Sequence, residues 1–89
     1  MGIMNRRVIV VGPSGCGKTT QAEAIAADMP NAVVVDEWNP QSVMAGSWVV
    51  CTQSLRSIPR YVQESADVIY QFAGVDEKRG RMWELVTKN

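Results

Sequence analysis

Three glycines, a lysine and a threonine stand together in the segment Gly12–Thr19, which reads Gly-Pro-Ser-Gly-Cys-Gly-Lys-Thr. It fits the phosphate-binding loop pattern G-x-x-x-x-G-K-[ST] at every specified position. In such a loop successive backbone N–H groups point at one anion, at the positive end of the following helix. The alternative, a glycine-rich turn that only caps a helix, is disfavoured because chance matches are rare. The predicted nucleotide-binding residues are Gly12, Pro13, Ser14, Gly15, Cys16, Gly17, Lys18, Thr19 and Thr20.

Two acidic residues follow the next apolar run of the chain. Val33–Val35 is followed by Asp36 and Glu37. At a strand tip, Asp36 could hold Mg²⁺ together with the Thr19 hydroxyl, and Glu37 could polarise a water for attack on the γ-phosphate. The alternative is a strand that simply ends in solvated charges. Beside a phosphate loop, we predict the metal role for Asp36 and the catalytic role for Glu37.

Polar and basic residues follow the next apolar run. Gln53 comes directly after Val49–Thr52, where its amide could sense the γ-phosphate or contact the attacking water. Arg56 and Arg60 come next, and either could stabilise transition-state charge in its own subunit or in a neighbour. The predicted catalytic residues are therefore Lys18, Glu37, Gln53 and Arg60. Two features are interpreted as structural. The basic run at 78–81 is interpreted as a solvated helix face, with a phosphate-contacting role as the alternative. The tryptophans are interpreted as packing residues, with adenine stacking as the alternative for Trp38, Trp48 and Trp83.

These residues need a scaffold that brings strand ends together. Apolar runs predict strands at 6–11, 32–35, 47–52 and 67–72. Helical spacing and end signals predict helices at 18–29, 59–65 and 76–87, the last capped by Asp76 with an ion pair between Glu77 and Arg81. The segment 38–42 is expected to be a turn, and 43–46 is ambiguous. The alternation predicts a three-layer α/β/α sandwich around a small, mainly parallel, four-stranded sheet, with ligands beyond the carboxyl ends of the strands.

Length, composition and charge narrow the function. Eighty-nine residues, 46% of them hydrophobic, predict one domain over 1–89. So small a chain has a small core, and we expect nucleotide, a partner or self-association to add stability. Nine basic and nine acidic residues cancel, which does not favour nucleic acid, although a local basic patch leaves that partner open. Two cysteines without histidine make no disulfide framework or zinc site, and with no apolar run of membrane length we expect a cytoplasmic protein with no membrane partner.

Together, these segments resemble the ASCE division of P-loop ATPases, the division with an additional strand and a catalytic glutamate. The likeness is closest to the FtsK–HerA group, which includes viral and phage DNA-packaging ATPases. There the loop is followed by a strand ending in Asp-Glu, like 33–37, and a strand ending in Thr-Gln, like 50–53. A segment with Pro and Arg follows, like 58–60, and then a last strand like 66–72. Only 17 residues separate Lys18 from Asp36, so a strand and a helix usual in full ASCE enzymes are missing.

The resemblance implies a pared-down core with the spatial strand order fourth–first–third–second. Reduction of this kind is common in small accessory proteins of phages and other mobile elements. The implied function is Mg²⁺-dependent ATP hydrolysis in a homo-oligomer or larger protein complex. ATP is favoured over GTP because no guanine-recognition motif of the Asn/Thr-Lys-x-Asp type occurs. Two alternatives stay open: a nucleotide or nucleoside kinase, and a non-catalytic module that regulates a partner through bound nucleotide.

Overall fold

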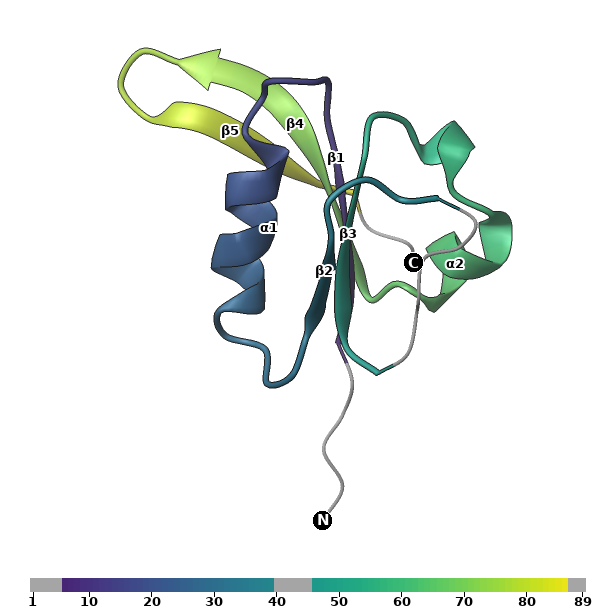
Figure 1. Cartoon of the computed structure of the whole chain (residues 1–89). Coiled ribbons are helices and arrows are strands. Elements are labelled where there is room, and N and C mark those ends of the chain that lie inside the picture. The colour runs from purple at the N-terminus through teal and green to yellow at the C-terminus, as the bar shows by residue number, and fades with distance from the viewer. Residues whose placement is uncertain (1–5, 40–45, 87–89) are drawn as a thin grey trace.

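The computed structural model describes residues 6–39 and 46–86, which form a five-stranded sheet in the order β2-β3-β1-β4-β5. The first four strands run parallel, and β5 is antiparallel to β4. The helix α1 and the pair η1 and α2 lie on opposite sides of the sheet (Figure 1), which makes the predicted three layers. The strands are β1 (Arg7–Val11), β2 (Val33–Val35), β3 (Trp48–Thr52), β4 (Val68–Asp76) and β5 (Gly80–Val86). The helices are α1 (Lys18–Ala26), the 3₁₀ helix η1 (Leu55–Ser57) and α2 (Arg60–Ser65).

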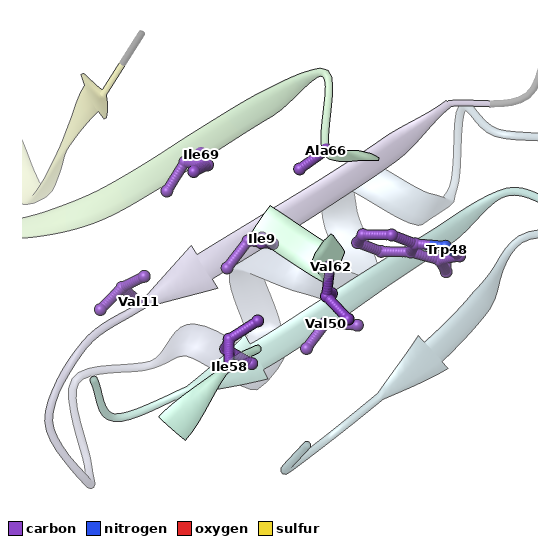
Figure 2. Packing of buried hydrophobic residues seen from close by; sticks show 8 residues of the cluster. All are labelled: Ile9, Val11, Trp48, Val50, Ile58, Val62, Ala66 and Ile69. Atoms are coloured by element: carbon purple, nitrogen blue, oxygen red, sulfur yellow. The ribbon is translucent and has the colours of Figure 1, made fainter. Parts of the chain in front are cut away.

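The two central strands supply both faces of the core. Successive residues of a strand point to opposite faces, so β1 and β3 each divide their side chains between two clusters. On the α2 side lies the cluster shown in Figure 2, which contains Ile9, Val11, Trp48, Val50, Ile58, Val62, Ala66 and Ile69. On the α1 side lie Val8, Val10, Ala22, Met29, Val49 and Cys51. Burial on both faces explains why these strands read as unbroken apolar runs.

The predicted order fourth–first–third–second is confirmed, because β4, β1, β3 and β2 lie in that sequence across the sheet. The first helix ends at Ala26, three residues before the predicted end at Met29. The last turn tightens there: the amides of Asp28 and Met29 donate to the carbonyls of Ile25 and Ala26. Met29 is nevertheless buried, as its apolar spacing indicated. Residues 40–45, which include parts of the predicted turn and of the ambiguous segment, lie outside the described residues.

The predicted last helix is wrong, and the sheet has five strands instead of four. Residues 80–86 form β5, which pairs with β4 and closes a hairpin. The Asp76 carboxylate accepts the amides of Lys78 and Arg79 at 2.8 and 3.1 Å, so it stabilises a turn and not a helix start. Gly80 has φ +77°, a left-handed conformation that no helix interior accommodates. Glu77 therefore lies in the turn and Arg81 in a strand, without the predicted ion pair.

The fourth strand also runs further than predicted. It continues past residue 72 to Asp76, with a register shift between Phe72 and Gly74. A glycine inside a strand often marks such a bulge instead of ending the strand. The ring of Phe72 packs edge-on against Trp83 of β5, with centroids 5.4 Å apart. This contact joins the two strands of the hairpin and gives Trp83 the packing role expected of it.

Replacing Trp48 with alanine should destabilise this core severely. The side chain is 1% exposed and belongs to the α2-side cluster. Truncating a buried aromatic residue typically costs about 3–5 kcal/mol through lost transfer free energy and the cavity left behind. Urea unfolding followed by circular dichroism measures the loss. The control is Val75→Ala, at a side chain that is 73% exposed, where the change should stay below about 1 kcal/mol.

Candidate phosphate-binding site

Three parallel strands bring their carboxyl ends to the same edge of the sheet. The register aligns Val11 of β1 with Thr52 of β3, and Val35 of β2 with Val50 of β3. Backbone hydrogen bonds continue past the strand ends. The Gly12 amide donates to the Thr52 carbonyl at 3.0 Å, and the Trp38 amide donates to the Cys51 carbonyl at 3.0 Å. The segments that begin at residues 12, 36 and 53 therefore start side by side.

The loop between β1 and α1 is tightly turned and closely packed. The Cys16 amide donates to the Pro13 carbonyl at 3.2 Å. Gly17, at the start of α1, has φ +88°, a left-handed conformation that other residues adopt only with strain. A methyl group on Gly12 would lie 2.5 Å from Cys16 Sγ and 3.1 Å from Phe72 Cβ, so only glycine fits there. The pattern's glycines thus serve the backbone path that a phosphate cradle requires.

Lys18 is the buried cation of this loop. The residue is only 8% exposed, and it makes no ion pair with any carboxylate of residues 6–39 and 46–86. Burying an ammonium group costs free energy unless an opposite charge compensates it. An anion that binds on the loop would supply that charge. The uncompensated charge of Lys18 therefore favours the binding of a phosphate group at this loop.

The predicted metal ligands lie in contact. The Thr19 hydroxyl donates to the Asp36 carboxylate at 2.5 Å, although 17 residues separate them in sequence. Both side chains are exposed and present oxygen atoms at the edge of the loop. Mg²⁺ favours oxygen ligands, and it is usually held by one or two protein oxygens together with substrate phosphates and water. The pair fits a magnesium ion that is shared with a nucleotide.

Gln53 also contacts the loop. Its side-chain amide donates to the Ser14 hydroxyl at 2.8 Å. The contact joins the end of β3 to the outer part of the phosphate loop, where a γ-phosphate sensor would have to lie. Glu37 is exposed and follows Asp36 directly, at the same edge.

Neither predicted arginine forms a hydrogen bond or an ion pair with the loop among the described residues. Arg56 lies exposed in η1, and its backbone amide donates to the Ser54 hydroxyl at 3.2 Å. Arg60 begins α2 on the face of the sheet opposite α1 (Figure 1). Its guanidinium lies 3.9 Å from the Glu64 carboxylate, with both side chains largely exposed.

Neither cysteine offers a reactive nucleophile to this site. Both are buried and reduced. Burial raises the pKa of the Cys51 thiol to about 11, with a smaller contribution from the Asp36 carboxylate. The thiol donates to the Lys18 carbonyl at 3.7 Å, beneath the start of α1. Cys51 is therefore a neutral packing residue, as its position in an apolar run indicated.

One basic residue lies at the loop although its element was predicted wrongly. Arg81 of β5 lies against Gly17: a methyl group on that glycine would be 3.0 Å from Arg81 Cδ and Nε and 3.1 Å from Cζ. Arg81 was predicted to lie on a solvated helix face, with phosphate contact only as the alternative, whereas it lies in β5. The signal that could have found it is the hairpin pattern, two apolar stretches separated by Asp-Glu-Lys-Arg-Gly.

The loop, the neighbouring carboxylate and the parallel sheet define a nucleotide-binding protein of the P-loop class. Residues 8–79 match the AAA family, described as the ATPase family associated with various cellular activities, and the chain belongs to that family. No curated protein and no solved structure matches the chain significantly. Within the described ranges, no helix is both long and apolar enough to cross a membrane.

Proposed function

We propose that this protein binds ATP with Mg²⁺ and hydrolyses it, and that it works as an oligomer or as a subunit of a larger protein complex. The observation that carries the proposal is the hydrogen bond between Thr19 and Asp36. It joins the last residue of the phosphate loop to the acidic tip of the neighbouring strand. Membership of the AAA ATPase family supports nucleotide binding and ATPase chemistry.

The residues divide the work by position. The loop amides and Lys18 hold the phosphates. Gln53, which is hydrogen-bonded to Ser14, contacts the terminal phosphate when it is bound. Glu37, one residue past the metal-side carboxylate, is free to orient a water for in-line attack and to take its proton. Thr19 and Asp36 would hold Mg²⁺, which when bound neutralises charge on the phosphates. Phosphoryl transfer consists mostly of positioning and electrostatic stabilisation, so a scaffold of this size suffices.

Assembly is part of the proposal for two reasons, which concern the outer strand β2 and the arginines Arg56 and Arg60. The strand β2 lies at one end of the strand order, and its Val33 and Val34 side chains are 42% and 36% exposed. An outer strand with exposed apolar side chains can pair with another chain. Neither Arg56 nor Arg60 is bonded to its own loop within the described residues, so we assign one of them to a neighbour's nucleotide. Activity per chain should rise with protein concentration as light scattering detects the oligomer. A monomer with a concentration-independent rate contradicts this part.

The prediction of an FtsK–HerA-type packaging ATPase of phage or mobile-element origin is finer than the family assignment, and it rests only on the sequence segments given above. The two other functions are outcomes of the same assay. A kinase would transfer the γ-phosphate to nucleosides or nucleotides in a panel. A regulatory module would bind ATP without releasing phosphate. Phosphate release in the absence of any acceptor supports the ATPase.

Asp36→Asn should separate metal binding from phosphate binding. The amide keeps a hydrogen-bond acceptor for Thr19 but removes the charge that favours Mg²⁺. Calorimetry should show ATP affinity reduced about tenfold in the presence of Mg²⁺ and little changed in EDTA. Asp28→Asn, at an exposed position after α1, is the matched control. Equal losses with and without Mg²⁺ would assign Asp36 a structural role.

A further inference from the structure

The β4–β5 hairpin overhangs the end of the sheet at which phosphates are expected. The strand β1 ends at Val11, opposite Gln71 of β4. The last five residues of β4 therefore extend past β1, and β5 returns alongside them with Arg81 opposite Val75. Figure 1 shows this hairpin projecting past the loop that joins β1 to α1. Hairpin residues that lie past the end of β1 can therefore lie close to the phosphate loop.

The hairpin contacts both ends of the phosphate loop. At the first end, Phe72 of β4 packs beside Gly12. At the second, the side chain of Arg81 lies over the backbone of Gly17, the residue at the start of α1. Phe72 also packs on Trp83, so one unit of the structure makes both contacts. Even a methyl group at Gly17 would be packed so tightly against Arg81 that the arginine side chain would have to shift slightly.

The charge of Arg81 has no ion-pair partner among the residues that the structure describes. No carboxylate of residues 6–39 and 46–86 forms an ion pair with it, and the side chain is exposed. Two acids lie at the hairpin turn. The Asp76 carboxylate accepts the amides of Lys78 and Arg79, and Glu77 forms no ion pair with Arg81. A free guanidinium beside N–H groups that converge at a helix start adds to the same positive field. Arginine suits this place, because its planar fork binds phosphate oxygens in pairs.

We propose that Arg81 is a further nucleotide-binding residue, a second phosphate-contacting cation supplied by the β4–β5 hairpin of the same chain. The inference rests on the proposed function in that Gly12–Thr19 must hold a nucleotide. Loop amides hold the α- and β-phosphates, whereas the loop lysine reaches the β- and γ-phosphates. A guanidinium over Gly17 therefore lies near the α/β end. It strengthens ADP and ATP binding by the same factor, unlike a group that reads only the γ-phosphate.

The test is calorimetric titration of Mg·ADP and Mg·ATP into Arg81→Gln, Arg81→Lys and the matched control Arg79→Gln. Arg79 carries the same charge in the same hairpin but lies exposed in the turn. Arg81→Gln should weaken both nucleotides about tenfold. Arg81→Lys should recover part of the loss, and Arg79→Gln should stay within about twofold. Because screening weakens an exposed charge contact, the difference between wild type and Arg81→Gln should shrink below about threefold in 0.5 M salt.

Three results would overturn the inference: Arg81→Gln binding ADP like the wild type, Arg79→Gln losing as much as Arg81→Gln, or a loss confined to ATP. A loss that salt does not reduce would assign Arg81 a packing role instead. Thermal melts of the nucleotide-free variants verify that the exposed substitutions leave the fold intact. If wild-type protein binds neither nucleotide, the proposed function fails, which is a different outcome from failure of Arg81.

Discussion

Glu37→Gln should leave ATP binding unchanged and lower the rate of phosphate release about 10²–10⁴-fold. Glutamine keeps the size and one acceptor oxygen of glutamate, but it cannot take a proton from water. Glu37 is exposed and does not belong to the contact between Thr19 and Asp36, so its neutralisation leaves that contact in place. Single-turnover hydrolysis of labelled ATP measures the chemical step, and calorimetry in the same buffer measures binding.

The control for this substitution is Glu23→Gln, an exposed glutamate of α1. Its hydrolysis rate should remain within about twofold of the wild type, because it lies on the helix and not at a strand end. Turnover by Glu37→Gln at the wild-type rate would remove Glu37 from the mechanism. If Glu37→Gln and Asp36→Asn instead show the same loss of Mg²⁺-dependent ATP affinity, both acids act through the metal.

The parallel part of the sheet was predictable because its physical signals are local and redundant. Strands buried on both faces need unbroken apolar runs, and the runs around Ile9 and Val50 are of this kind. The phosphate loop fixes where the first strand stops and the first helix starts. Once strands and helices alternate, right-handed crossovers leave few possible strand orders. The position of Asp36 beside Thr19 follows from that order.

The hairpin was not predictable in the same way, because its sequence satisfies two periodicities at once. Met82, Leu85 and Val86 have the spacing of a helix face, and Asp76 before them is an ordinary helix cap. What decides for a strand is tertiary: β4 overhangs β1 and needs a partner for its backbone, and Trp83 packs on Phe72. The left-handed Gly80 was the local sign against a helix. Because the element type was wrong, Arg81 was also placed wrongly.

The corrected hairpin changes how the charge of the site is understood. A helix at 76–87 would have kept the run 78–81 as a solvated face, with Lys18 as the sole cation at the loop. As a strand, β5 returns one of these arginines to the start of α1, while Arg60 stays on the opposite side of the sheet. With Arg81 in β5, two cations of one chain, Lys18 and Arg81, lie at the loop.

Lys18→Ala should abolish tight nucleotide binding, with ATP affinity at least about 100-fold below that of the wild type. Lys18 is the buried cation of the loop, and the described residues provide no carboxylate to compensate it. Its removal lowers phosphate affinity while relieving the nucleotide-free protein of a buried charge. The variant should therefore melt at the same or a higher temperature than wild type without ATP, yet gain no stability when ATP is added.

Lys78→Ala is the matched control, since that lysine lies exposed in the hairpin turn. Calorimetry and thermal melts with and without Mg·ATP measure both effects, and Lys78→Ala should behave like the wild type in each. ATP that bound Lys18→Ala as tightly as the wild type would contradict the assignment of Gly12–Thr19 as a working phosphate loop. A loss of ATP binding with a large drop in nucleotide-free stability would instead make Lys18 a structural residue. The ATP affinity and the nucleotide-free stability, measured together, therefore distinguish a lysine that serves ligand binding from one that stabilises the fold.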